Sequence, residues 1–98
     1  MQSQTQDVLF QYVNRIHEIY GSELKAVILY GSYARGDYTE SSDIDIMILV
    51  DSTEDTIKQK GRMVSDITFD FNLDHDIMIM PIVKNVNHFQ YWLSADPF

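Results

Sequence analysis

Two short stretches of the sequence carry residue types that can do chemistry: Gly31-Ser32 with Arg35, and Asp43-Ile44-Asp45. Side chains two apart on a β-strand point to the same side, so we expect the Asp43 and Asp45 carboxylates to lie close together. Two neighbouring carboxylates repel each other, and a divalent cation between them relieves that repulsion. Without His or Cys beside them, the oxygen-only donor set favours Mg²⁺ or Mn²⁺.

The first stretch is typical of a turn that binds phosphate. Gly31 permits backbone angles that other residues avoid. Ser32 adds a hydroxyl and free backbone N–H groups at a point where a short helix can begin. Arg35 lies one helical turn further on and can add a charge-assisted contact to an anion. We therefore predict that Gly31, Ser32 and Arg35 bind the phosphates of a nucleotide.

The charge around this turn predicts metal dependence. Arg35 is a single cation among Asp37, Glu40, Asp43 and Asp45, so a bare triphosphate would be repelled. A divalent metal neutralises both the phosphates and the carboxylates. Two such ions on shared carboxylates can stabilise the attacking and the leaving oxygen of a phosphoryl-type transfer.

A third carboxylate would complete the metal site or accept the proton of the nucleophile. We predict that Asp76 takes this role, because a strand over about residues 75–83 would bring it beside Asp45 by strand pairing. Asp74 is the second choice, since it shares the alternation but precedes the expected strand.

The remaining sequence must build the elements that hold these groups, and it predicts one small α/β (α+β) domain over residues 1–98. Apolar residues at helical spacing predict a helix over about 3–21. A short continuous apolar run predicts a strand at 26–30 that is covered on both faces, and a period of two predicts a strand at 44–50. A helix that begins at Ser52 or Thr53 precedes the third strand. The complete expected order is helix 3–21, strands 26–30 and 44–50, a helix to about 71, strand 75–83 and a closing helix that contains Phe89 and Trp92. Such an order gives a small mixed sheet with helices packed on it.

Composition excludes several classes of protein. The formal net charge of −8 argues against a non-specific nucleic-acid binder, which needs a basic face. The absence of cysteine rules out disulfide scaffolds and zinc-thiolate sites. No apolar run approaches the ~20 residues of a membrane span, and the polar start lacks the layout of a signal peptide. We therefore expect a cytoplasmic protein that does not bind membranes.

Gly31-Ser32, ten intervening residues and Asp43-Ile44-Asp45 resemble the signature of the polymerase beta-type nucleotidyltransferase superfamily. The Ala-Arg-Gly after Ser32 and the short chain resemble its minimal nucleotidyltransferase (MNT) branch. The resemblance implies the nucleotidyltransferase fold, a triphosphate held by Gly31 and Ser32, two Mg²⁺ ions on Asp43 and Asp45, and Asp76 as the third carboxylate. The implied reaction transfers a nucleoside monophosphate from a triphosphate, most simply AMP from ATP, to an acceptor hydroxyl.

The same resemblance implies a partner. Minimal members are typically paired with a helical HEPN protein, and some act as antitoxins that add AMP to a tyrosine of that RNase toxin. Larger relatives carry a second domain that binds the acceptor, and this chain lacks one, so we expect another chain to supply the acceptor. Two alternatives stay open: a binding module that neutralises a HEPN toxin by contact, and a structural metal-binding domain with no nucleotide role. Tyr33 and Tyr38 flank the expected pocket, where they can stack on a base.

Overall fold

The structure, a computed structural model, describes residues 3–39 and 42–88. The closing helix expected around Phe89 and Trp92 lies outside the described residues. The described elements follow one another as α1 (Ser3–Tyr20), the 3-10 turn η1 (Gly21–Glu23), β1 (Leu24–Tyr30), α2 (Ser32–Arg35), β2 (Ile44–Val50), α3 (Glu54–His75) and β3 (Ile79–Asn85).

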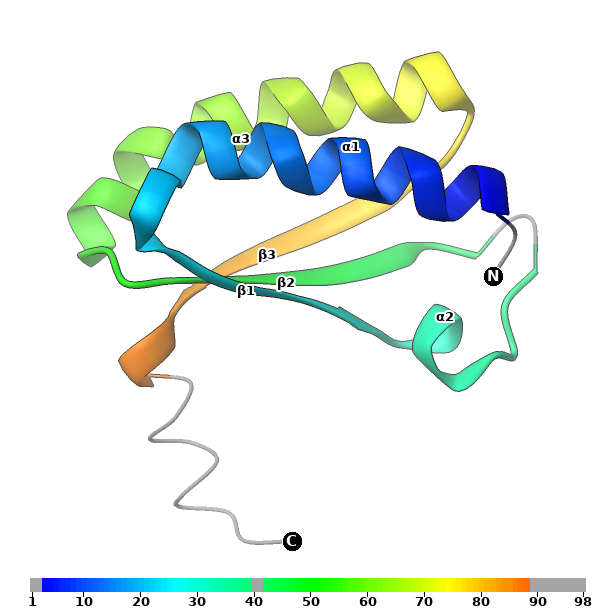
Figure 1. Cartoon of the computed structure of the whole chain (residues 1–98), viewed down its shortest axis with the longest axis horizontal. Helices are drawn as coiled ribbons and strands as arrows, with labels where there is room; N and C mark the ends of the chain where they lie inside the picture. The colour runs from blue at the N-terminus through cyan, green and yellow to red at the C-terminus, as the bar shows by residue number, and fades with distance from the viewer. Residues whose placement is uncertain (1–2, 40–41, 89–98) are drawn as a thin grey trace, which may run out of the picture.

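The strands form one mixed sheet in the order β1-β2-β3. β1 pairs with β2 antiparallel, and β2 pairs with β3 parallel. The parallel pair needs a crossover connection, which α3 provides. α1 and α3 lie side by side over the same face of the sheet, and no described helix of comparable length covers the other face (Figure 1). This confirms the expected small α+β protein with a mixed sheet.

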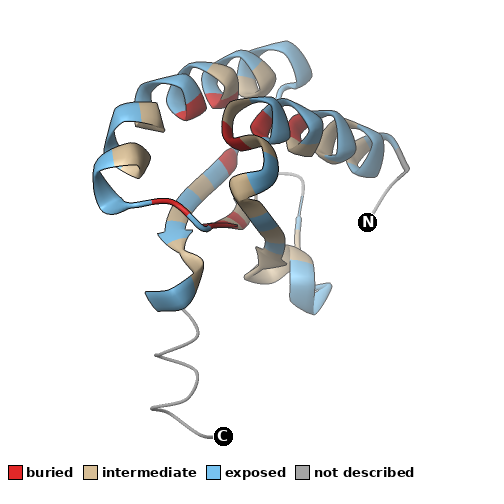
Figure 2. Ribbon diagram, turned by 60° about the vertical axis from the view of Figure 1, so that its left-hand side comes forward, coloured by how far each residue is buried: buried red, intermediate tan, exposed pale blue. Residues whose placement is uncertain are grey.

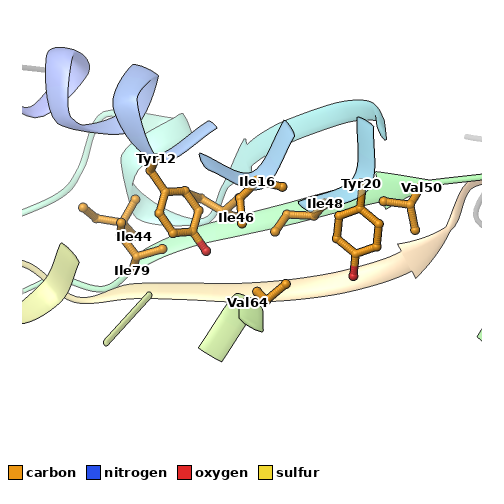
Figure 3. Packing of buried hydrophobic residues seen from close by; sticks show 9 residues of the cluster. All are labelled: Tyr12, Ile16, Tyr20, Ile44, Ile46, Ile48, Val50, Val64 and Ile79. Atoms are coloured by element: carbon orange, nitrogen blue, oxygen red, sulfur yellow. The ribbon is translucent and has the colours of Figure 1, made fainter. Parts of the chain in front are cut away.

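The core lies between the helix pair and the sheet, where the buried residues gather in Figure 2. On β2 the side chains alternate, so the buried isoleucines face the helices and the residues between them face the open side. Figure 3 shows how side chains from α1 and α3 meet this row of β2. The cluster comprises Tyr12, Ile16, Tyr20, Ile44, Ile46, Ile48, Val50, Val64 and Ile79. Complete burial of each aliphatic member contributes about 1.5–3 kcal/mol to folding.

The predicted start of α3 is confirmed, but its end is later than expected. Thr53 caps the helix, and its side chain accepts a hydrogen bond from the Thr56 backbone N–H at 3.2 Å. The helix continues to His75, and Asp76 ends it in a left-handed conformation with φ 51°. β3 therefore begins at Ile79, so the expectation of a strand from residue 75 is wrong.

Asn72 is the physical reason for this late start. Its side-chain amide accepts from the Ile79 backbone N–H at 2.7 Å and donates to the Ile79 carbonyl at 3.2 Å. The amide thus pairs with both backbone groups of the first residue of β3 and holds the strand entrance against the helix.

Within residues 3–39 and 42–88, no helix combines the length and the hydropathy that crossing a bilayer requires.

Candidate active site

Gly31 and Asp45 meet at the end of β1. Gly31 follows the strand with φ 75° and ψ −151°, a conformation that glycine adopts without steric cost. The Asp45 carboxylate lies directly against the Gly31 Cα: a Cβ at this position would be 3.2 Å from the Asp45 Cγ and closer still to Oδ2. Glycine at position 31 therefore serves two purposes, since it makes the turn and leaves room for the carboxylate.

The predicted short helix starts directly after Gly31. α2 is one turn long: the Arg35 N–H donates to the Gly31 carbonyl at 3.1 Å, and the Gly36 N–H donates to the Ser32 carbonyl at 2.9 Å. Gly36 then leaves the turn with φ 85°. Ser32 is half-buried and directly follows Gly31, against which the Asp45 carboxylate lies. Gly31 and Ser32 together are called the glycine corner below.

Asp45 is the second residue of β2 and lies on the side of the sheet that the helix pair does not cover. Ile44 is 1% exposed and belongs to the core, so its neighbour Asp45 points to the opposite face. Asp43 is the last residue before the strand and is exposed. The period-two prediction for this strand is confirmed, and the contact with Gly31 places Asp45 beside the glycine corner.

Asp76 does not occupy the expected strand position. The residue of β3 paired with Asp45 is Met80, and the Ile44 N–H donates to the Met78 carbonyl at 2.8 Å. Asp76 is exposed and caps α3, and the second choice, Asp74, is exposed within the last turn of that helix. The expectation that strand pairing sets Asp76 beside Asp45 is therefore wrong. Among residues 3–39 and 42–88, no group of three His, Asp or Glu side chains is arranged to hold a metal ion.

Arg35 is paired with a carboxylate of its own loop. Its Nε lies 3.4 Å from Asp37 Oδ2, and the two side chains are 65% and 63% exposed. Exposed ion pairs contribute about 0–1 kcal/mol, so an anion that binds at the corner can displace Asp37 from Arg35 at little cost.

The donors at this corner suit a hard divalent cation. Asp43 and Asp45 offer only oxygen, and Mg²⁺ is commonly held by one or two carboxylates together with water and substrate phosphates. Asp45 is half-buried and lies against Gly31, so its carboxylate is more constrained than that of the exposed Asp43. The chemistry of these two side chains therefore fits Mg²⁺ or Mn²⁺.

Two features of the site region were missed by the sequence analysis. The first is the Asn72 amide that sets where β3 begins, for which the sequence has no recognisable signal. The second is the relation of Tyr33 to Tyr38: the two rings stack on each other, with centroids 4.4 Å apart and an interplanar angle of 9°. The sequence predicts only that the two residues flank the site, because their mutual contact depends on the path of the loop.

Known proteins support the resemblance suggested by the motif. Three relatives from Methanocaldococcus jannaschii are similar to the chain, and each is named as a candidate protein adenylyltransferase. The first is 40% identical over 77 residues, 79% of this chain and 76% of the relative. The second is 42% identical over 64 residues, 65% of this chain and 49% of the relative. The third is 29% identical over 77 residues, 79% of this chain and 52% of the relative.

The chain thus matches only about half of the length of two of these relatives. No solved structure matches the chain significantly. The sequence profile of the family described as "Polymerase beta, Nucleotidyltransferase" matches residues 11–94, which is most of the chain. This match includes the glycine corner, the two carboxylates Asp43 and Asp45, and the strands β1 and β2. The chain therefore belongs to the polymerase beta nucleotidyltransferase family.

Proposed function

We propose that this protein is a metal-dependent nucleotidyltransferase that transfers AMP from ATP to a hydroxyl group of a partner protein. The observation that supports this most is the contact between the Asp45 carboxylate and Gly31, which joins a metal-binding group to a phosphate-binding turn. The names of the relatives support the choice of adenylate and of a protein acceptor.

In this proposal the glycine corner holds the triphosphate. The open backbone at Gly31 and the Ser32 hydroxyl contact the phosphates, and Arg35 exchanges Asp37 for a phosphate oxygen. A guanidinium–phosphate contact is charge-assisted on both sides and is stronger than the exposed pair that it replaces. The exchange also moves the Asp37 charge away from the nucleotide.

Asp43 and Asp45 would hold the metal, with Mg²⁺ as the preferred ion and Mn²⁺ as a substitute. The bound ion would neutralise the triphosphate and stabilise charge that develops on the attacking and leaving oxygens. Asp76 remains in the proposal as the third carboxylate. Its support is the Ile44–Met78 hydrogen bond, which ties the segment entering β3 to the beginning of β2.

The chemical step balances as follows. The oxygen of the acceptor hydroxyl forms a bond to the α-phosphorus of ATP, and the bond from that phosphorus to the bridging oxygen of the β-phosphate breaks. Pyrophosphate leaves with the electron pair, and the hydroxyl proton passes to a carboxylate, for which Asp76 is our candidate, or to water. The acceptor carries AMP through a phosphodiester bond afterwards.

We propose a helical HEPN-type RNase toxin as the acceptor, which makes this protein the antitoxin of the pair. The support for this partner is the resemblance of Gly31-Ser32-Tyr33-Ala34-Arg35-Gly36 to the minimal branch. A second candidate function is neutralisation of the same toxin by contact alone. That alternative is favoured by one observation: the described residues do not gather three carboxylates around a metal position.

Labelled ATP separates the two functions. The chain is incubated with a HEPN partner, Mg²⁺ and ATP labelled at the α-phosphate, and label on the partner is measured together with its RNase activity. We expect label transfer that Asp43→Asn abolishes and the matched Asp51→Asn leaves intact, since Asp51 is an exposed residue at the opposite end of β2. Neutralisation by Asp43→Asn without any label would instead establish the contact mechanism.

A further inference from the structure

We infer that the Tyr38 ring, backed by Tyr33, is the platform on which the nucleobase of the bound nucleotide stacks. This inference rests on the proposed function and adds a residue that selects a nucleotide over a plain polyphosphate. Its starting point is the parallel ring pair, with centroids 4.4 Å apart.

The two rings have different roles. Tyr33 packs against the hydrophobic core as well as against Tyr38, so it is anchored to the body of the domain. Tyr38 has one face covered by Tyr33 and is only half-buried, so part of the residue stays accessible to a ligand. An anchored aromatic pair that a ligand can still reach is the type of surface on which proteins stack bases.

The loop holds this ring near the candidate site. The Thr39 N–H donates to the Ser42 hydroxyl at 2.8 Å, and the Ser42 N–H donates to the Thr39 carbonyl at 3.1 Å. A turn closed in this way brings the residues on its two sides toward each other. These residues are Tyr38 and the metal-ligand candidate Asp43.

The glycine corner, Gly31-Ser32, directly precedes the first ring of the pair in the chain. Tyr33 directly follows Ser32 in α2, so the anchored ring and the corner belong to the same helical turn. A nucleotide with its phosphates at the corner and its metal at Asp43 can therefore extend its base along the loop to Tyr38. Because the stack is already formed, little side-chain freedom is lost on binding.

Stacking of a base depends on the π-face of the Tyr38 ring and not on its hydroxyl group. The test therefore compares a variant that removes the ring with one that removes only the hydroxyl. Equilibrium dialysis without an acceptor measures the affinity of the full chain for ATP and for inorganic tripolyphosphate, each with Mg²⁺. We expect the wild type to bind ATP more tightly than tripolyphosphate. Tyr38→Ala should weaken ATP binding about tenfold and leave tripolyphosphate unchanged, whereas Tyr38→Phe should retain both affinities.

Phe69→Ala is the matched control, since Phe69 is an aromatic residue of α3 that is 65% exposed and belongs to a different surface. An equal loss of ATP and tripolyphosphate affinity in Tyr38→Ala would show that the ring only supports the loop, and would overturn the inference. Equal affinity of the wild type for the two ligands would also overturn it, while leaving the phosphate site in place. Failure of both ligands to bind the wild type would reject the proposed function itself.

Discussion

The Asp45 carboxylate lies against the Cα of Gly31, in space that any other residue would fill with its own Cβ. This contact links the end of β1 to the beginning of β2 and sets an acidic side chain beside the corner at Ser32. The proposed metal ligand Asp45 can therefore approach the proposed phosphate-binding turn this closely only because residue 31 has no Cβ.

Gly31→Ala is accordingly expected to abolish activity and to destabilise the fold. The new Cβ would overlap the carboxylate, and alanine at φ 75° is strained by about 1–3 kcal/mol. Label transfer and urea denaturation measure the two effects. Gly21→Ala is the control: φ there is 57°, but nothing lies within 4 Å of a Cβ, so the strain is present without the overlap. Equal activity losses in both variants would contradict the role of the contact.

Metal removal should separate nucleotide binding from simple ion binding. ATP with Mg²⁺ at about 100 times its dissociation constant should stabilise the protein by about 2.7 kcal/mol, a rise in melting temperature of about 10–20 °C. EDTA should eliminate the rise, and Mg²⁺ alone should give far less. We expect Asp45→Asn to lose the ATP-dependent shift, with Asp51→Asn as control. An equal shift with Mg²⁺ alone would support a structural metal site without a nucleotide role.

Asn72→Ala tests what holds the entrance of β3. The substitution removes both hydrogen bonds to Ile79, a core residue that is 1% exposed, and leaves its backbone groups without these partners. We expect a loss of about 1–3 kcal/mol in the free energy of unfolding. Asn14→Ala, at an exposed position of α1, should change it by less than about 0.5 kcal/mol. Similar unfolding midpoints for the two variants would rule out this role for Asn72.

Two buried tyrosines should differ in how the loss of the hydroxyl group changes the stability of the fold. The Thr68 hydroxyl donates to the Val64 carbonyl, so the Tyr12 hydroxyl donates to Thr68 at 2.7 Å. Tyr12→Phe should cost about 1 kcal/mol. The buried Tyr20 hydroxyl has no hydrogen-bond partner among the described residues, so Tyr20→Phe should be neutral or stabilising. Thermal unfolding of both variants at neutral pH measures the contrast.

The same residues predict how stability depends on pH. Burial raises the pKa of Tyr12 above its usual 10.0, and burial together with the Glu23 charge raises the pKa of Tyr20. A raised pKa in the folded state means that the contribution to stability is complete below pH 10 and is lost as pH rises toward the folded pKa. We expect unfolding free energy to fall above about pH 10, and less steeply in a Tyr12→Phe, Tyr20→Phe double variant. If the unfolding free energy of the double variant fell with pH as steeply as that of the wild type, this pH dependence could not be assigned to Tyr12 and Tyr20.

The local features of this protein follow from patterns of neighbouring residues. The period of two around Ile44 places one row of side chains in the core and Asp45 on the other face, because alternation is a property of any strand. The turn at Gly31-Ser32 and the Thr53 cap are also visible in the sequence, since each depends on residues within one helical turn. These patterns were sufficient for the fold class and for the family.

Which residue of β3 pairs with Asp45 depends on contacts between elements that are distant in the sequence. The sequence around Asp76 alternates like a strand, and the Asn72 amide overrides this pattern by pairing with Ile79 and starting β3 later, so that Met80 takes the position. The stack of Tyr38 on Tyr33 was equally hidden, because it depends on how the loop returns to Asp43. Local patterns specify which way a side chain points within its element, but contacts between elements set the register, and the register decides which groups meet.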